Sequence, residues 1–194
     1  MSDKHVRFDE AKLTERKKHH CGFQFCPLCG LRLKEGEVEG LVRLYCPDQT
    51  CGYVFYQNPI PAAGVMLVEN DHILLVKRAH PPRIGWWCIP AGFMEWNEHP
   101  RQTAVRELEE ETGLKVRLTS FFEVYSGSDD PRSNAVLMLY LGEVIGGEIA
   151  PADDAREVRW FPFDALPADI AFEAHRQALA DYDHRERKRA QIKS

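Results

Sequence analysis

The stretch Gly92–Leu114, GFMEWNEHPRQTAVRELEEETGL, gathers glutamates in a segment that has the pattern of a helix. Pro100 suits the first turn of a helix and Gly113 suits a left-handed residue after the last turn, which predicts a helix over about residues 100–112. Glutamates three and four residues apart on one helix face repel each other, by roughly 0.2–0.5 kcal/mol per pair. The sequence therefore places an unfavourable charge cluster in a helix, and bound cations would relieve it.

The acids of this segment fall on one side of the predicted helix. Glu107, Glu110 and Glu111 stand at i, i+3 and i+4, whereas apolar residues such as Leu108 lie on the other side and can pack against a sheet. A solvated acidic face is the usual explanation of a charge run, but no lysine is interleaved with these acids. The helix also follows directly on an aromatic loop, WWCIPAG. Carboxylate oxygens are the ligands that Mg²⁺ or Mn²⁺ prefers, so the sequence predicts a divalent cation site here.

The spacing of these residues resembles the Nudix box, G-x5-E-x7-R-E-U-x-E-E-x-G-U, in which U is an apolar residue. The chain matches all fixed positions of the box, which fall on Gly92, Glu98, Arg106, Glu107, Leu108, Glu110, Glu111, Gly113 and Leu114. The resemblance implies an α/β fold, the Nudix α/β/α sandwich with a mixed sheet, in which this helix lies against the sheet. Ala91 and Asn97 stand where glycine is common in the family, and both lie outside the fixed positions.

The resemblance also assigns roles to the residues of the box. These implied roles are metal binding for Glu107, Glu110, Glu111 and Glu95, orientation of the helix for Arg106 and Glu98, and backbone structure for Gly92 and Gly113. Family members hydrolyse a nucleoside diphosphate linked to a further moiety. Divalent cations would neutralise the pyrophosphate charge and lower the pKa of the attacking water.

A carboxylate near the metals must accept the proton of that water. Glu110 or Glu111 is the expected general base, and Glu107 and Arg106 complete the expected catalytic set. Further candidates are the acids of the loop SGSDDPRSN at residues 126–134, together with Asp153, Asp154 and Glu157. The sequence leaves the choice among them open.

Four cysteines form a second pattern with the spacing of a metal site. Cys26 and Cys29 are separated by two residues, Cys46 and Cys51 by four, and sixteen residues lie between the pairs. Two such pairs can supply the tetrahedral thiolate ligands of zinc, and a segment this short cannot bury enough core to fold alone. The alternative, four ordinary buried thiols, does not explain the pairing. The pattern predicts a structural zinc site in a small zinc-ribbon domain.

Two neighbours of these pairs and one remote cysteine need separate interpretations. The four-residue spacing of the second pair is wider than usual, so His20 and Cys21 are alternative ligands. Cys88 stands between Trp87 and Ile89 and is interpreted as a core thiol.

The chain divides into four predicted segments. These are a flexible charged tail at 1–22, the zinc ribbon at 23–58 with strands in LVRLY and YVFYQ, the Nudix hydrolase domain at 59–166, and a C-terminal helix with a charged tail at 167–194. In the third segment we expect a hairpin of 65–69 and 72–77, a long loop at 78–92, the acidic helix, and strands near 118–125, 135–143 and 158–162. The prolines of QNPIP mark the boundary before it and disfavour pairing in a sheet.

A zinc ribbon before a Nudix domain resembles two groups of enzymes. The NADH pyrophosphatase group, which includes enzymes that remove NAD caps from RNA, has an S-Q-P-W-P-F-P-x-S array after the box, and this chain lacks it. The ADP-ribose and FAD pyrophosphatase group is similar at YQNP, PAGF and IAF, here residues 56–59, 90–93 and 170–172. The resemblance favours ADP-ribose or FAD, cleaved to AMP and a phosphorylated product.

Aromatic and arginine side chains near the box are candidate substrate contacts. Aromatic rings can stack on adenine, and guanidinium groups can clamp phosphate. The candidates are Trp86 and Phe93 with Trp96 as a further ring, and Arg78 and Arg83 with Arg132 as a further cation. Trp87 is interpreted as a core residue.

Composition narrows the function classes. A formal net charge of −5 gives no general attraction to DNA or to an anionic membrane, and no apolar run approaches the roughly 20 residues that span a bilayer. We expect a cytoplasmic enzyme acting on a nucleotide-diphosphate small molecule, with the ribbon as a candidate homodimer contact. A non-enzymatic alternative, a nucleotide-sensing module that binds RNA or protein, would predict missing box glutamates, and all are present.

Overall fold

The structure of the protein is a computed structural model that describes residues 23–151 and 155–193, with side chains to residue 185. Its main division into two compact units falls between Pro59 and Ile60. The predicted tail 1–22, with the alternative ligands His20 and Cys21, and the candidate bases Asp153 and Asp154 lie outside the described residues.

The first unit is built on a small antiparallel sheet. Its strands are β1 (Lys34–Val38), β2 (Leu41–Tyr45) and β3 (Val54–Phe55), in the order β1-β2-β3. The β1–β2 hairpin turns at Glu39 and Gly40, whose φ angles of 55° and 77° are both positive. β1 was not predicted because its sequence, KEGEV, has no apolar alternation, and the strand predicted in YVFYQ is only two residues long.

The second unit contains a seven-stranded mixed sheet with the order β10-β5-β4-β9-β8, to which β6 adds on β5 and β7 on β4. The parallel pair is β4 with β9, and the other pairs are antiparallel. The strands are β4 (Ile60–Glu69), β5 (His72–Arg78), β6 (Trp87–Cys88), β7 (Ala91–Phe93), β8 (Leu114–Gly127), β9 (Ala135–Gly147) and β10 (Ala155–Pro162). The helices are α2 (Pro100–Thr112), the short 3-10 helix η2 (Phe163–Ala165) and α3 (Glu173–Lys193).

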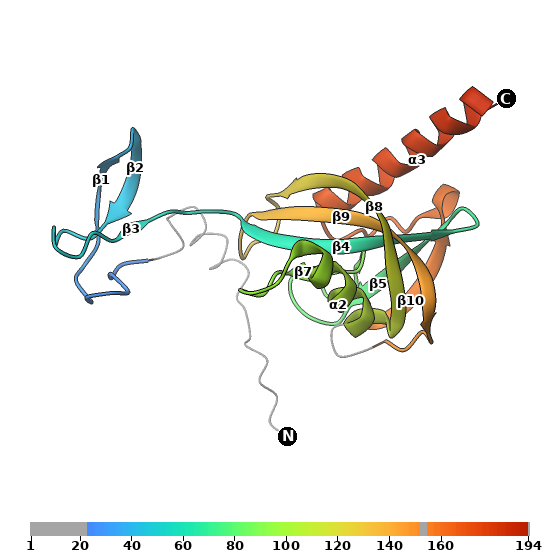
Figure 1. Cartoon of the computed structure of the whole chain (residues 1–194), viewed down its shortest axis with the longest axis horizontal. Helices are drawn as coiled ribbons and strands as arrows, with labels where there is room; N and C mark the ends of the chain where they lie inside the picture. The colour runs from blue at the N-terminus through green and yellow to red at the C-terminus, as the bar shows by residue number, and fades with distance from the viewer. Residues whose placement is uncertain (1–22, 152–154, 194) are drawn as a thin grey trace, which may run out of the picture. The chain divides into compact units, whose positions relative to one another are not determined.

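The sheet separates two apolar layers, each covered by one helix (Figure 1). Residues of β4 alternate between the layers: Met66 belongs to the layer that includes Ala178 of α3, and Val65 and Leu67 belong to the layer that includes Leu108 of α2. This period of two is what a strand buried on both faces requires. The predicted α/β/α sandwich with a mixed sheet is therefore confirmed.

The predicted hairpin is present, and its turn explains the sequence there. Asn70 and Asp71 join β4 to β5 with φ angles of 48° and 62°, a conformation that asparagine and aspartate tolerate. The strands of the second unit are longer than predicted, and Pro61 lies inside β4, paired with Val136. The Pro61 carbonyl accepts a hydrogen bond from Met94 N–H at 3.1 Å, a contact that does not need the N–H that proline lacks.

Two short strands occupy the region predicted as a loop, and they position the box. One edge of β4 pairs along its length with β9, and its other edge pairs first with β7 and then with β5. Gly64 of β4 lies opposite Ala91, and a Cβ there would overlap the Pro90 carbonyl and Ala91. The backbone before the box is thus packed directly on the centre of the sheet.

Candidate active site

The acidic helix α2 begins and ends at the predicted residues. His99 precedes it: its Nδ1 accepts the Arg101 N–H at 3.2 Å, and its own N–H donates to Gln102 Oε1 at 2.8 Å. At the other end Gly113 has a φ of 75° and donates its N–H to Glu109 O at 2.8 Å. These contacts satisfy backbone groups that a helix leaves unpaired at its ends.

Glu98 ties the loop before α2 to the helix. Arg106 Nε donates to Glu98 Oε1 at 2.6 Å and Arg106 Nη2 donates to Glu98 Oε2 at 2.8 Å. Thr103 Oγ1, at 2.7 Å, and Glu95 N–H, at 3.1 Å, also donate to Glu98 Oε2. Arg106 is the largest of the influences that lower the pKa of Glu98 to about 2. A carboxylate with this many donors remains ionised and holds the loop in place.

The same guanidinium reaches two other acids of the helix. Arg106 Nη1 donates to Glu107 Oε1 at 2.7 Å and to Glu110 Oε2 at 2.9 Å. The contact with Glu98, followed by those with these two glutamates, raises the pKa of Arg106. The side chain of Glu107 is 15% exposed and that of Glu110 is 59% exposed, so Glu110 is the acid of this group most open to solvent.

β7 supports the two inner glutamates. Glu111 is buried, and its Oε2 accepts the Ala91 N–H at 3.2 Å. Gly92 lies against Glu107, and a Cβ at Gly92 would overlap the Glu107 carboxylate. A glycine at this position therefore leaves the space that the Glu107 carboxylate occupies beside β7.

The arrangement supplies hard oxygen donors for a divalent cation. Glu107, Glu110 and Glu111 come from one face of α2, and the fit is chemical: clustered carboxylates suit Mg²⁺ or Mn²⁺. Among the described residues their carboxylates do not converge within 4.8 Å, as the four clustered cysteine sulfurs do, and Arg106 Nη1 donates to both Glu107 and Glu110. Glu95 is exposed and joins the group through its backbone bond to Glu98.

The four paired cysteines do converge. Their sulfur atoms all lie within 4.8 Å of one another. Among the described residues, no other group of three or more His, Cys, Asp or Glu side chains brings its ligand atoms this close together. The Sγ–Sγ distances are 3.6 Å for Cys26 and Cys51 and 3.4 Å for Cys29 and Cys46. A tetrahedral zinc with Zn–S bonds of about 2.3 Å requires Sγ–Sγ distances of about 3.8 Å. The cluster therefore matches a metal-binding site in size and in donor type.

The turns around these cysteines direct backbone amides at sulfur. Gly30 and Gly52 follow the two pairs with φ angles of 75° and 66°. Burial raises the pKa of Cys26, but the amides of Cys29 and Leu28 outweigh it and lower the pKa to about 7. Amide donors of this kind favour the thiolate of Cys26, the form that binds a metal, whereas burial raises the pKa of Cys46 to about 12.

Arg78 and Arg83, the predicted phosphate clamps, contact protein groups in this structure. Arg78 Nε donates to Pro82 O at 2.8 Å, and its guanidinium lies 5.0 Å from the centre of the Phe172 ring. Arg83 Nη1 pairs with Asp129 Oδ2 at 2.8 Å, and its guanidinium lies 5.2 Å from the same ring. Both arginines thus connect the loop after β5 to the segment before α3, and their role toward phosphate stays a prediction.

The aromatic candidates have different environments. Trp87 is buried and packs edge-on against Phe161 with ring centres 4.7 Å apart, as a core residue does. Phe93 is half-buried against the layer beneath α3. Trp86 is 40% exposed and Trp96 is fully exposed, so both rings are accessible to a ligand. Glu157, a candidate base, lies on β10 in ion pairs with Lys77 and Arg159.

Two side chains have contacts that the sequence did not indicate. Asp129 Oδ2 accepts the N–H of Glu173 at 3.0 Å and so caps the start of α3, across 44 positions of sequence. His175 is buried, and its Nδ1 accepts the N–H of Ile89 at 3.1 Å. The sequence signal that could have identified His175 is its position next to Ala174, within the apolar positions of a predicted helix.

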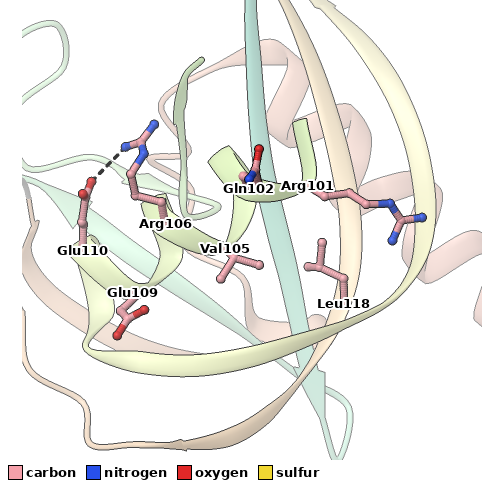
Figure 2. A pocket seen from close by; sticks show the side chains of 7 residues that line it. All are labelled: Arg101, Gln102, Val105, Arg106, Glu109, Glu110 and Leu118. Atoms are coloured by element: carbon pink, nitrogen blue, oxygen red, sulfur yellow. Dashed lines mark hydrogen bonds and ion pairs between the residues drawn. The ribbon is translucent and has the colours of Figure 1, made fainter. Parts of the chain in front are cut away.

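An open groove of about 570 Å³ is lined by one side of α2 and by Leu118 of β8. Figure 2 shows Arg106 and Glu110 near one end of the drawn residues, and Arg101 and Leu118 at the other. Its lining residues are Arg101, Gln102, Val105, Arg106, Glu109, Glu110 and Leu118.

The fold and the box together define the class. The family model described as NUDIX domain matches residues 58–182. A crystal structure of a NUDIX hydrolase from Nitrosomonas europaea is 35% identical, with a TM-score of 0.70 over 81% of this chain and 88% of that chain. The chain belongs to the Nudix hydrolase family.

Two named relatives carry more specific descriptions. The ADP-ribose pyrophosphatase of Methanocaldococcus jannaschii is 37% identical over 131 residues, which are 67% of this chain and 76% of that protein. The NAD-capped RNA hydrolase NudC of Pseudomonas aeruginosa is 34% identical over 148 residues, 74% of this chain. The chain spans about half the length of the NudC relatives, and the matched region covers 49% of the Pseudomonas aeruginosa protein. No helix in the described part of the chain is long and apolar enough to span a membrane.

Proposed function

We propose that the chain is a Mg²⁺- or Mn²⁺-dependent pyrophosphohydrolase that cleaves ADP-ribose or FAD to AMP and a phosphorylated product. The observation that carries the proposal is the set of three glutamates on one face of α2, two of them supported by β7. The ADP-ribose pyrophosphatase relative and the resemblances at YQNP, PAGF and IAF support the choice of substrate.

The residues of α2 divide the work of hydrolysis. When bound, the cations neutralise the diphosphate and lower the pKa of the attacking water. Glu107, Glu110 and Glu111, with Glu95 as a further carboxylate, would hold these cations, and Glu110 or Glu111 would accept the proton as water adds to phosphorus. The bridging P–O bond then breaks, and ADP-ribose yields AMP and ribose 5-phosphate. Arg106 keeps its two bonds to Glu98 and so preserves the orientation of the helix.

The exposed aromatic rings and the two arginines complete the proposed substrate contacts. Trp86 is accessible and lies beside Arg83, whose guanidinium is 5.9 Å from its ring centre. Phe93 adjoins the box directly, because Arg106 Nη2 donates to Phe93 O at 3.3 Å. A ring that stacks on adenine and cations that approach phosphate would give affinity for the AMP half.

For the first unit we propose a structural zinc site. Four thiolates would close the coordination sphere and leave no position for a reacting water, so the metal would stabilise the fold and take no part in hydrolysis.

The experiment that tests the function is a substrate panel. ADP-ribose, FAD, NADH and NAD-capped RNA are incubated with the protein and Mg²⁺, and AMP release is measured. We expect the highest kcat/KM with ADP-ribose or FAD. The second candidate function, hydrolysis of NADH or of NAD-capped RNA, is favoured by the NudC relatives, and a higher kcat/KM with either of those substrates would establish it.

A pair of variants on one helix tests the metal site. Substitution of a residue that hydrogen-bonds to a metal ligand typically lowers activity about 10–100-fold. Glu110 is proposed to be a ligand itself, so E110Q should lower AMP release by more than about 100-fold. E109Q is the matched control, because Glu109 is exposed and stands outside the fixed positions of the box. Full activity in E110Q would refute the assignment. Retained RNA binding in Mg²⁺-free buffer, with no substrate hydrolysed, would support the non-enzymatic alternative instead.

A further inference from the structure

His175 is a polar side chain on the buried face of α3. Its neighbours on that face, Ala174, Ala178 and Leu179, are apolar and buried, and His175 itself is only 7% exposed. Its Nδ1 accepts the backbone N–H of Ile89 at 3.1 Å. Buried histidines with satisfied rings occur in many protein cores, so the place of Ile89 in the fold decides whether this one has a further role.

Ile89 lies where the chain leaves β6 and turns toward β7. β6 is paired on one side with β5. On its other side the segment before α3 holds it: Trp87 N–H donates to Asp169 O at 2.9 Å, and Ala171 N–H donates to Trp87 O at 2.7 Å. Beyond β6 this strand pairing stops. The N–H of Ile89 is instead satisfied by a side chain, that of His175.

Two residues further on, the same backbone holds a carboxylate of the box. Pro90 has no N–H and a restricted φ, so it links the peptide of Ile89 stiffly to Ala91. The Ala91 N–H donates to Glu111 Oε2 at 3.2 Å, and Pro90 O accepts the Val65 N–H at 3.1 Å. The two N–H groups of this short connection therefore bond to side chains of α3 and α2.

We propose that His175 is a positioning residue for the metal site: by accepting the Ile89 N–H it fixes the connection between β6 and β7, and this fixes the direction of the Glu111 carboxylate. The inference rests on the proposed function, because that function makes Glu111 a metal ligand. The proposal gives His175, which follows the IAF segment, a role at the active site, although it lies more than sixty positions after Glu111 in the sequence.

The ring of His175 is a neutral acceptor. Burial is the largest cause that lowers its pKa to about 3, Arg78 and Arg176 lower it further, and Asp129 opposes them. Because Nδ1 accepts, the proton is on Nε2. Asparagine keeps an acceptor, since its Oδ1 stands as many bonds from the backbone as Nδ1 of histidine. Leucine fills similar space without an acceptor.

The test compares the full-length wild type with H175L and H175N, and with H184L at an exposed position of the same helix as the control. The first readout is kcat and KM for AMP release from ADP-ribose at increasing Mg²⁺. The second is Mn²⁺ binding without substrate, followed by electron paramagnetic resonance.

We expect H175L to weaken Mn²⁺ binding about tenfold and to raise the Mg²⁺ concentration needed for half-maximal activity by the same factor. Tenfold is the lower end of the range seen when a residue that contacts a metal ligand, but not the metal, is substituted. kcat should fall more than KM for ADP-ribose changes. H175N should restore wild-type metal binding, and H184L should leave it unchanged.

Three results would overturn the proposal. H175L with a lower Tm but wild-type Mn²⁺ binding would make His175 a core residue only. H175N that restores Tm without restoring Mn²⁺ binding would do the same. If H175L does not fold, H175Q replaces it, since its acceptor stands one bond further from the backbone, and unchanged Mn²⁺ binding in H175Q would refute the proposal. A wild type that binds Mn²⁺ but hydrolyses no substrate refutes the proposed function alone, and the Mn²⁺ comparison then decides the role of His175.

Discussion

The first unit and the second unit bury their side chains to very different extents. In the first, the buried apolar cluster consists of Cys26, Leu33, Leu44 and Cys46, so half of it is made of the predicted metal ligands. Several large apolar residues there are exposed, including Leu28 at 71% and Val42 at 65%. The second unit has two apolar layers, one on each face of its sheet. A unit with so small a core requires another source of stability.

This contrast distinguishes a proposed structural metal in the first unit from a proposed catalytic metal in the second. In the first unit the proposed ligands are soft sulfur atoms that lie within 4.8 Å of one another, and two of the residues, Cys26 and Cys46, form part of the core. In the second unit the acids stand on a helix whose apolar face is already packed, and Glu110 is open to solvent. Loss of the first metal should therefore unfold its unit, whereas loss of the second should stop catalysis and leave the fold intact.

Removal of the metal from the first unit should have the largest effect. Structural zinc sites supply about 10–16 kcal/mol of apparent binding free energy, far more than this small core can replace. In C46S, or after chelation, we expect the amide NMR signals of residues 23–58 to collapse to the positions of an unfolded chain. All four tryptophans, at 86, 87, 96 and 160, lie in the second unit, so their fluorescence should keep its melting temperature.

The conservative variant C88S serves as the control for that experiment. Cys88 is a buried cysteine of the second unit, remote in sequence from the four clustered ones. The C88S variant should leave the amide NMR signals of residues 23–58 unchanged. A metal-free chain that retained those signals would contradict the assigned role of the thiolates.

Two glycines of the second unit should separate stability from catalysis. In G64A the new Cβ would overlap backbone at Pro90 and Ala91, which cannot move aside easily. In G92A it would overlap only the Glu107 carboxylate, the end of a flexible side chain. We expect G64A to lose about 1–3 kcal/mol of unfolding free energy. G92A should stay within about 0.5 kcal/mol of wild type and lose AMP release instead.

Urea unfolding followed by tryptophan fluorescence measures the first quantity, and AMP release at saturating Mg²⁺ measures the second. The two variants add the same methyl group one strand apart, so each is the control for the other. If G92A retained wild-type activity, Glu107 would not need its present position, and its assignment as a metal ligand would be wrong.

The sequence predicted best those features that depend on residues close together in the chain. The helix at 100–112 was predicted from Pro100 and Gly113, which act through local backbone geometry. The cysteine cluster was predicted from the short spacings within each pair. The resemblance assigned Arg106 and Glu98, two fixed positions of one motif, to the orientation of the helix, and the two side chains are in contact.

Features made by contacts between distant residues were not predicted. β7 is three residues of a Pro-Gly-rich loop, and it pairs only because β4 offers an open edge. The cap that Asp129 provides joins a loop to the first residue of α3, 44 positions later in the sequence. No local pattern indicates that a partner this remote will satisfy a helix end, and the same holds for His175 and Ile89. Glu111 was expected as a metal ligand, but its support by Ala91 follows from this pairing.

The smallest expected effect concerns Glu98, which stabilises the second unit without a metal. Its pKa is lowered to about 2, chiefly by Arg106, so its stabilising contribution is complete above its unfolded-state pKa of about 4.3 and is lost as the pH falls through about 2. The wild type should therefore be more stable than E98Q at pH 6, and this difference should shrink steadily below pH 4.3. Tryptophan fluorescence melts across this range measure it in the second unit alone. A difference that stayed constant down to pH 2 would mean that the ion pair with Arg106 contributes nothing and that Glu98 acts only through neutral hydrogen bonds, such as the one from Thr103, which glutamine can also accept.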